Sequence, residues 1–300
     1  MSKYQNRTSD IKRLCVGTAA AIKNYGVINK AEYFHPEEAK KVFNLCDKNS
    51  IKFIDTAQAY GNAERIIGKF TDSKYNIITK IWLNENPPPK EIENIESKFL
   101  KSLKFLQKEN IYGVLIHNPH HLNQKRGQKI YKELNKLKEQ KLVSKIGISI
   151  YDPNDFSDLN KYYDFDIVQL PFNIFDNSYI SSGLNTKLRK KNVEVFLRSI
   201  FLQGILLLPI NKVPARFAKW VKHLKKYHNW LSERNISPLE ANILNALQVN
   251  KREKIIVGIN SLQELKEIIT IINKNKKISN INQFTINDKM LINPSNWSKL

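Results

Sequence analysis

The feature that most constrains this chain is a regular alternation of short apolar runs with longer amphipathic stretches. Each run is continuous and rich in β-branched residues, which is typical of parallel strands covered on both faces. Helical spacing of apolar residues predicts helices between the runs, among them 90–106, 237–249 and 261–273. The last two open on Ser237 and Ser261, each with a glutamate three positions later, as in a capping box. The expected strands are 13–18, 51–56, 76–81, 111–117, 145–150, 166–172, 193–199 and 254–259.

Eight strand–helix units in 300 residues favour an α/β fold, a (β/α)₈ (TIM) barrel. The alternative is a doubly wound open sheet. Such a sheet usually carries a glycine-rich dinucleotide fingerprint after its first strand, where this chain has only Gly17. No stretch rich in Pro, Gly or Ser divides the chain, so we predict a single domain over 1–300. Residues from about 275 to 300 lack strong periodicity, and we expect them to pack as a C-terminal cap.

Cysteine content and apolar runs bear on the cellular compartment. Cys15 and Cys46 are too few for a disulfide framework, and we expect both to be small buried hydrophobic residues in a reducing compartment. The apolar run 14–22 follows a polar start and is short, unlike a signal peptide. No later run approaches the roughly 20 apolar residues of a membrane span. We therefore expect a cytoplasmic protein with no membrane partner.

The net charge of +21 has two interpretations, a basic binding surface or a lysine-rich solvated exterior. The basic residues are scattered over the whole chain, without a block of five or six, an aromatic–basic stripe or metal-ligand spacing. The scatter favours the solvated exterior. We therefore expect no nucleic-acid partner and no metal, with some electrostatic steering of anionic ligands.

Polar residues gather at one end of the expected strands. The active site of such a barrel lies at the C-terminal ends of its strands, whereas the opposite ends show no comparable set. Taken alone, each of these residues would be an ordinary helix cap, turn or packing residue. Lys80 is less ordinary, because a lysine that ends an apolar strand needs an anion, and Asp55 is the natural partner. The residues at these ends are Asp55, Tyr60, Lys80, His117, Ser149, Gln169, Arg198 and Ser199.

These residues could transfer a proton. A carbonyl that accepts hydride needs a proton donor, and a tyrosine is too weak an acid unless its anion is stabilised. Lys80 can supply a cation that lowers the pKa of Tyr60, and Asp55 can hold Lys80 in place. His117 can hydrogen-bond the carbonyl oxygen and orient it.

Seven segments, in order, resemble the aldo-keto reductases. FIDTAQAYGNAERIIGKF (53–70) resembles the most specific signature of that family. Residues 16–30 and 293–297 are similar to a bacterial branch with short loops. The other segments resemble the lysine strand (77–82), the histidine strand (113–119), the Gly-x-Ser strand (144–149), the Gln…Asn strand (167–173), the cofactor-loop strand (198–207) and the adenine-ribose segment (257–269).

The resemblance implies a catalytic tetrad of Asp55, Tyr60, Lys80 and His117, with Trp82 and His117 lining the substrate pocket. It implies NADP or NAD as cofactor, with Ser149 and Gln169 holding the nicotinamide carboxamide. The remaining residues that we expect at the cofactor are Thr18, Arg198, Ser199, Gly258, Asn260, Ser261 and Glu264.

Four positions depart from the better-known branches of the family. Ile150 replaces an Asn at the carboxamide, and Arg198 replaces an aromatic ring that stacks on the nicotinamide, although a guanidinium plane can also stack. Glu264 stands where Arg or Gln is frequent, and Ile268 where Asn is frequent. The choice between NAD and NADP therefore stays open, and we expect NADH to be used at least comparably to NADPH.

The expected function is the reduction of an aldehyde, ketone or sugar carbonyl to an alcohol, or the reverse, with Tyr60 as general acid or base. The alternative is a cofactor-binding barrel with little turnover that acts as a regulatory or scaffold subunit. Short polar loops, with His120 and His121 after the fourth strand, favour a sugar or another small polar carbonyl. The sequence leaves the oligomeric state open.

Overall fold

The eight expected strands form a closed parallel barrel. The computed structural model describes residues 10–22, 26–27 and 35–300, so part of the segment 16–30 lies outside the described residues. Neighbouring strands pair in chain order, and β8 closes the barrel against β1. The predicted single-domain TIM barrel is confirmed. The strands are β1 (Leu14–Gly17), β2 (Phe53–Asp55), β3 (Asn76–Ile81), β4 (Ile111–Ile116), β5 (Val143–Ser149), β6 (Ile167–Pro171), β7 (Glu194–Arg198) and β8 (Lys254–Gly258).

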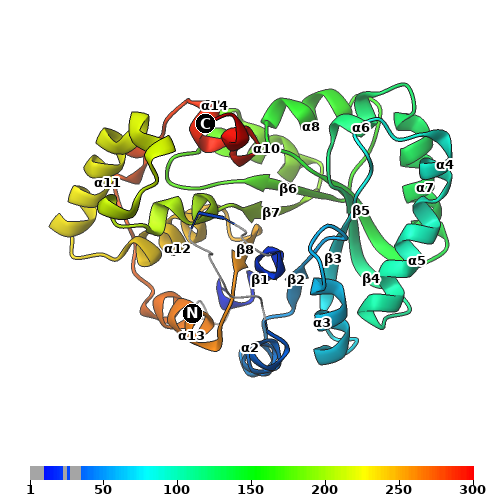
Figure 1. The fold of residues 1–300 in the computed structure, drawn as a ribbon, viewed down its shortest axis with the longest axis horizontal. Coiled ribbons are helices and arrows are strands. Elements are labelled where there is room, and N and C mark those ends of the chain that lie inside the picture. Colours follow the sequence, from blue (N-terminus) through cyan, green and yellow to red (C-terminus); the bar gives the residue numbers. More distant parts are fainter. Residues whose placement is uncertain (1–9, 23–25, 28–34) are drawn as a thin grey trace.

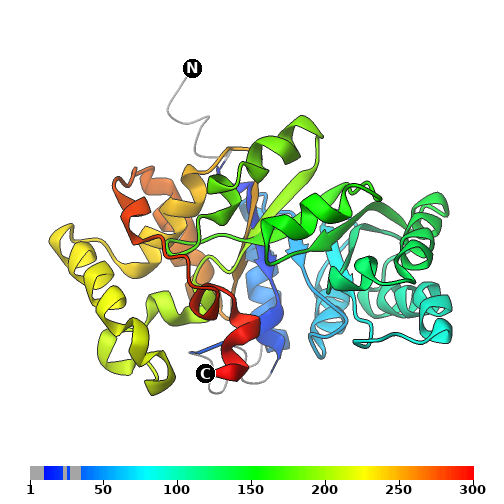
Figure 2. The ribbon, with the colours of Figure 1, turned by 90° about the horizontal axis from the view of Figure 1, so that it is seen from above.

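Helices surround the strands (Figure 1). In both ribbon views α11 lies at one end of the molecule, with α4, α5 and α7 at the other (Figures 1 and 2). The α-helices are α2 (Pro36–Lys48), α3 (Ala63–Phe70), α4 (Pro89–Glu93), α5 (Ile95–Leu106), α6 (His120–Asn123), α7 (Gly127–Glu139), α8 (Pro153–Leu159), α9 (Ser178–Ser181), α10 (Leu184–Lys190), α11 (Val221–Glu233), α12 (Pro238–Gln248), α13 (Leu262–Lys274) and α14 (Lys289–Ile292). Short 3₁₀ turns are η1 (Ala19–Ala21), η2 (Leu202–Leu207), η3 (Ile210–Lys212), η4 (Ala215–Trp220), η5 (Ile281–Phe284) and η6 (Pro294–Lys299).

The three expected helices form, with differences in the first helix and in the cap of the third. The helix expected over 90–106 is divided into α4 and α5 at Asn94, whose backbone leaves the helical region. Ser237 and Ser261 cap α12 and α13 by accepting the backbone N–H of Glu240 and Glu264. The glutamate half of the second capping box is shifted by one residue, because the Glu264 carboxylate accepts the N–H of Asn260.

A small apolar cluster fills the inside of the barrel, separate from the large core between strands and helices. Its buried members are Cys15, Ile78, Leu115, Ile167, Phe196 and Ile256, and Phe53 packs against it. Side chains alternate along a strand, so the residue two positions further along points to the same side. The next inward positions toward the C-terminal ends are therefore Gly17, Asp55, Lys80, His117, Gln169, Arg198 and Gly258.

The N-terminal ends of the strands also carry a polar network, and the expectation of no comparable set there is wrong. Glu194 at the start of β7 accepts from the hydroxyl of Tyr112 at 2.6 Å and pairs with Lys145. Lys145 also donates to the Tyr112 hydroxyl at 3.0 Å. The three residues come from β4, β5 and β7, so the network ties three neighbouring strands together.

The segment after α13 contains only short helical turns, but its side chains pack against the rest of the barrel. The Trp297 ring lies edge-on to Phe217 at 4.8 Å, and its indole nitrogen donates to the carbonyl of Leu291 at 2.9 Å. Lys289 pairs with Asp152 at the start of α8. The end of the chain is thereby tied to two loops that follow strands.

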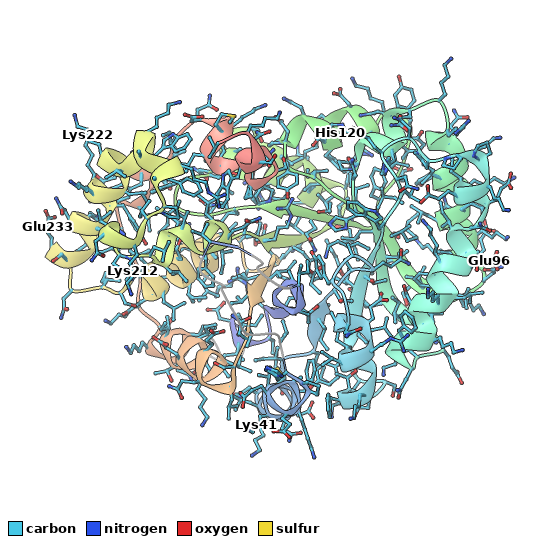
Figure 3. The ribbon with its side chains drawn as sticks, in the orientation of Figure 1. Lys41, Glu96, His120, Lys212, Lys222 and Glu233 are labelled. Atoms are coloured by element: carbon cyan, nitrogen blue, oxygen red, sulfur yellow. The ribbon has the colours of Figure 1, made fainter. Side chains whose placement is uncertain are left out.

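Two findings concern the expected compartment. Cys15 and Cys46 are both buried and free, as predicted. Over the described residues, no helix combines the length and hydropathy needed to cross a membrane. Charged side chains such as Lys41, Glu96 and Lys222 lie on outer helices and point away from the barrel (Figure 3).

Candidate active site

A cavity of about 720 Å³ lies at the C-terminal ends of the strands. Its wall contains the inward residues that follow the apolar cluster, together with loops after β1, β2, β7 and β8. The sequence-predicted residues in the wall are Asp55, Tyr60, Lys80, Trp82, His117, Ser149, Gln169, Arg198, Ser199, Gly258, Asn260 and Glu264. The structure thus gathers most of the predicted site in one place.

A buried ion pair forms the floor of the cavity. Lys80 is only 1% exposed, and its Nζ donates to both carboxylate oxygens of Asp55 at 2.7 and 2.8 Å. Nζ also donates to the carbonyl of Thr56 at 2.9 Å, and the Gln169 side-chain amide donates to Asp55 at 2.7 Å. Two charges can be held out of water at this depth because each has its opposite charge and additional hydrogen bonds.

Tyr60 lies above this pair. Lys80 Nζ is 3.5 Å from the Tyr60 hydroxyl, a long contact. Burial raises the pKa of Tyr60 well above its usual value, and the negative charge of Asp55 raises it further. Lys80 was expected to lower this pKa, but the cation that lowers it in the structure is Arg198. Asp55 neutralises Lys80 through a direct ion pair, whereas Arg198 forms no ion pair within the described part of the chain.

His117 is held as a neutral ring. Burial lowers the pKa of His117 to about 3, and the positive charges of Lys80 and Arg198 add to the effect. Its Nδ1 is buried without a hydrogen-bond partner among the described residues. The ring stands nearly perpendicular to Tyr60 and to Trp82, at centroid distances of 6.0 and 5.4 Å. A neutral imidazole between two aromatic rings can donate one hydrogen bond into the cavity.

Trp82 borders the mouth of the cavity and is 51% exposed. Its backbone N–H donates to the side-chain oxygen of Gln58 at 3.2 Å. The Gln58 amide nitrogen donates in turn to Ser102 and to the carbonyl of Lys98 on α5. Sequence reasoning missed Gln58, although it lies between Asp55 and Tyr60, because a loop glutamine gives no sign of its partner.

Arg198 ends β7 and turns over the end of β5. One guanidinium nitrogen donates to the carbonyl of Ile150 at 2.9 Å and another to the hydroxyl of Ser199 at 3.1 Å. The guanidinium carbon lies 4.0 Å from the centre of the Tyr151 ring. Tyr151 also lines the cavity and was not among the predicted residues.

The loop after β7 has an unusual backbone. Ser199, Leu202 and Gln203 all have positive φ, between 47° and 57°, a region that side chains disfavour. Val27 donates to the carbonyl of Gln203 at 2.9 Å, and a Cβ on Gly26 would lie 2.8 Å from that oxygen. The loops after β1 and β7 therefore meet backbone to backbone, and only glycine fits at position 26.

The loop after β8 and α13 form the far wall. Gly258, Asn260 and Glu264 line the cavity, together with Glu267 and Ile268, which the site prediction did not include. The Glu264 carboxylate accepts the backbone N–H of Asn260 at 2.7 Å. The side-chain oxygen of Asn260 is buried and has no partner within the part of the chain that the structure describes.

Two residues predicted at the cofactor are not in the wall. The hydroxyl of Thr18 donates to the backbone carbonyl of Asp55 at 2.9 Å, so it joins the ends of β1 and β2. The Ser261 hydroxyl accepts the N–H of Glu264 and caps α13. Both side chains are occupied by structural hydrogen bonds.

Comparisons with known proteins found a family model and solved structures that this chain resembles. The family model described as Aldo/keto reductase family matches residues 13–288. Among solved structures, the holo form of aldo-keto reductase AKR11C1 from Bacillus halodurans is 16% identical, with a TM-score of 0.70 over 91% of this chain and 90% of that chain. Glycerol dehydrogenase AKR11B4 from Gluconobacter oxydans is 17% identical, with a TM-score of 0.65 over 90% and 89%. Among curated protein sequences, none matches this chain.

Proposed function

The chain belongs to the aldo/keto reductase family and is therefore an NAD(P)-dependent oxidoreductase, and we propose that it reduces a small polar carbonyl compound to an alcohol with Tyr60 as proton donor. One observation carries the proposal: a fully paired Lys80–Asp55 ion pair lies beneath the Tyr60 hydroxyl and opens on a large cavity. A bound nicotinamide supplies the hydride in this chemistry.

The path of the proton follows from the protonation states of the side chains around the carbonyl. Tyr60 is neutral because its pKa is raised, so its hydroxyl can donate to the carbonyl oxygen. As negative charge develops on that oxygen, the proton moves from Tyr60 to it, and the positive charge of Arg198, which lowers the pKa of Tyr60, stabilises the tyrosinate. In alcohol oxidation the same proton moves in the opposite direction.

His117 has the orienting role in this proposal. Its ring is neutral, so one nitrogen carries a hydrogen that can be donated to the carbonyl oxygen. The neighbouring Trp82 ring, half open to solvent, offers an apolar face for the rest of the substrate. A small polar substrate, such as a sugar, suits this partly open mouth.

The described residues fit a nicotinamide dinucleotide. The unpartnered side-chain oxygen of Asn260 is an acceptor for a ribose hydroxyl, and Ser149 and Gln169 are polar groups on neighbouring strands for the carboxamide. Arg198 and Ser199 lie at the start of the loop whose backbone meets Gly26. Gly258 and Glu264 complete the proposed site for the adenosine of the cofactor. Thr18 and Ser261 support the site indirectly, through their hydrogen bonds to backbone groups.

We propose weak discrimination between the two cofactors, with NADH used at least comparably to NADPH. The wall beside α13 presents the carboxylates of Glu264 and Glu267 and no cation among its described residues. Lys266 is exposed and lies outside the wall. A phosphate on the adenine ribose would meet negative charge there, whereas a ribose hydroxyl can donate to Glu264.

We also propose that residues 275–300 act as a C-terminal cap. The support is the packing of Trp297 on Phe217 and the ion pair from Lys289 to Asp152. These contacts hold the loops around the cavity from outside.

The test is consumption of NADH and NADPH with a panel of aldehydes, ketones and sugars, in the parent and in Tyr60→Phe. We expect turnover in the parent and a loss of roughly 10²–10⁴ in kcat in the variant, with cofactor affinity measured by tryptophan fluorescence close to the parent. A regulatory barrel would bind cofactor and show no turnover in either protein. A Tyr60→Phe kcat within about threefold of the parent would show that another group donates the proton.

A further inference from the structure

The main chain of Trp82 is held at both of its polar groups. Its N–H donates to Gln58 Oε1 at 3.2 Å, and its carbonyl accepts from Lys98 Nζ at 3.0 Å. The Trp82 ring is 51% exposed and borders the cavity, with its centroid 5.4 Å from that of the His117 ring. A ring that is half open to solvent has few neighbours that fix it, so its position depends on how its main chain is held.

Gln58 connects this main chain to α5. Its amide nitrogen donates to the carbonyl of Lys98 at 3.1 Å and to the hydroxyl of Ser102 at 3.0 Å, so both amide hydrogens are used. Its backbone N–H donates to the carbonyl of Lys80 at 3.2 Å. Gln58 thus bonds to α5 on one side, and to Lys80 and Trp82 at the end of the neighbouring strand on the other.

The anchor on α5 is itself fixed. Ser102 is buried, and its hydroxyl hydrogen-bonds the buried carboxyl group of Glu64 on α3. Glu64 also accepts from the hydroxyl of Thr79 on β3 at 2.7 Å. The support of Trp82 therefore reaches back through two helices to the strand that precedes it.

Lys98 holds the same loop from a second direction. Its ammonium group pairs with Glu91 on α4. The Glu91 carboxylate accepts the backbone N–H and the side-chain amide of Asn84 at 3.2 and 2.9 Å. The loop that begins with Trp82 is therefore held at two of its residues by side chains from α4 and α5.

The proposed proton donor lies in the same turn as Gln58. The N–H of Tyr60 donates to the carbonyl of Ala57 at 2.9 Å, which closes this turn. The rings of Tyr60 and Trp82 both stand nearly perpendicular to the ring of His117. Gln58 thereby joins the turn that carries the proton donor to the residue that borders the mouth of the cavity.

We propose that Gln58 and Lys98 are positioning residues that hold Trp82 as a fixed wall of the substrate site, and that they thereby determine the affinity for the part of a carbonyl substrate that extends beyond its C=O group. This inference rests on the proposed function. A wall that is already fixed loses no conformational freedom when substrate binds, whereas a loose wall must be ordered at a cost in affinity. One hydrogen bond of this kind corresponds to about 3- to 10-fold in binding.

The first test compares Gln58→Leu with the parent on two aldehydes of different size, acetaldehyde and benzaldehyde. Leucine keeps the backbone N–H that bonds to Lys80 and removes the side-chain bonds. KM for benzaldehyde should rise by about 3- to 10-fold and KM for acetaldehyde by less than half that factor, while kcat should fall by less than KM rises. An equal change of KM for the two aldehydes would overturn the inference.

Lys98→Met and Lys98→Arg test the other half of the support. Methionine removes the cation that binds the Trp82 carbonyl, so KM for benzaldehyde should rise as in Gln58→Leu. Arginine can still donate to that carbonyl and to Glu91, so its KM should lie close to that of the parent. An arginine variant as impaired as the methionine variant would contradict the role of Lys98.

Combination with Trp82→Ala shows whether Gln58 acts through the ring. Alanine removes the indole and keeps the N–H and the carbonyl. In the Trp82→Ala background, Gln58→Leu should change KM for benzaldehyde by less than about twofold. A further rise of about 3- to 10-fold would place the effect of Gln58 elsewhere and refute its action through Trp82.

Gln248→Leu is the matched control. Gln248 is the last residue of α12, whose first residues border the cavity, and its side-chain oxygen accepts the backbone N–H of Ile278 at 2.6 Å. This variant removes the same kind of bond away from the mouth of the cavity, so KM for both aldehydes should equal that of the parent. A rise as large as that in Gln58→Leu would assign the effect to lost stability and overturn the positioning role.

A measurement without turnover separates this inference from the proposed function. Of the four tryptophans, Trp82 is half exposed and the others are buried, so the red edge of the emission reports mainly on Trp82. The time-resolved anisotropy of this emission should gain a faster component in Gln58→Leu and not in the control. That result without turnover of either aldehyde would retain the support of Trp82 while the proposed function fails. An unchanged anisotropy decay in Gln58→Leu would show that Gln58 does not hold the ring, and the inference would be wrong.

Discussion

Replacing Lys80 by methionine should destabilise the protein and abolish turnover together. The side chain is 1% exposed and donates three short hydrogen bonds, two of them to Asp55. Methionine has a similar length but no charge. Asp55, itself only 4% exposed, would keep a single side-chain donor, Gln169. A carboxylate would then be buried without its cation.

The size of the loss can be estimated. Removing one partner of a buried ion pair costs about 3–5 kcal/mol. The entropy of unfolding is about 2 cal/mol/K per residue, which for 300 residues is roughly 0.6 kcal/mol/K. The quotient is a fall in Tm of about 5–8 °C. Calorimetry or circular dichroism measures it directly.

Two further variants make the result specific. Asp55→Asn combined with Lys80→Met removes both charges, so most of the lost stability should return while activity stays absent. Lys41 forms an exposed pair with Glu38 at 2.8 Å (Figure 3 labels Lys41), and Lys41→Met should leave Tm within the measurement error. A Tm for Lys80→Met within about 1 °C of the parent would refute the reasoning, since Lys80 would then be solvated.

Three more outcomes are expected. Glu264→Arg should shift the preference toward NADPH by about 10-fold or more, measured as the ratio of the two cofactor affinities; no shift would mean that Glu264 faces away from the adenine ribose. The pKa of His117 is lowered from 6.5 to about 3, so on acidification the unfolded chain binds this proton first. The stability that the neutral ring contributes above pH 6.5 is therefore lost as pH falls toward 3. The difference in unfolding free energy between the parent and His117→Asn should shrink over that window, and a constant difference would contradict the lowered pKa. Despite its charge, the protein should show no submicromolar, sequence-dependent DNA binding at physiological salt in a fluorescence assay.

The strands and the centre of the site were predictable because they follow from periodicity. Continuous apolar runs identified all eight strands, and the polar residues at the ends of the second to seventh runs identified the cavity floor. The match between Lys80 and Asp55 was foreseeable because a lysine ending an apolar strand needs an anion. Each of these inferences depends only on neighbours along one strand or on adjacent strands.

Other features depend on contacts that a sequence does not display. The hydrogen bonds that the Trp82 backbone donates to Gln58 and that Gln169 donates to Asp55 join residues whose partners only the folded chain reveals. The raised pKa of Tyr60 results from burial, which the sequence analysis underestimated against the charge of Lys80. The Tyr112–Lys145–Glu194 network was missed because its residues start strands that otherwise read as apolar.

The two-residue step from the apolar cluster to the cavity floor limits how this enzyme can evolve. The two residues of each pair, Ile78 and Lys80 or Phe196 and Arg198, lie two positions apart on one strand, so both side chains face the inside of the barrel. A one-residue insertion in such a strand would turn the hydrophobic filling and the reactive side chain outward at once. Mutation can therefore exchange the chemical group at a strand end, but it cannot move that group along the strand. New specificities must come from substitutions at these fixed positions or from length changes in the loops beyond them.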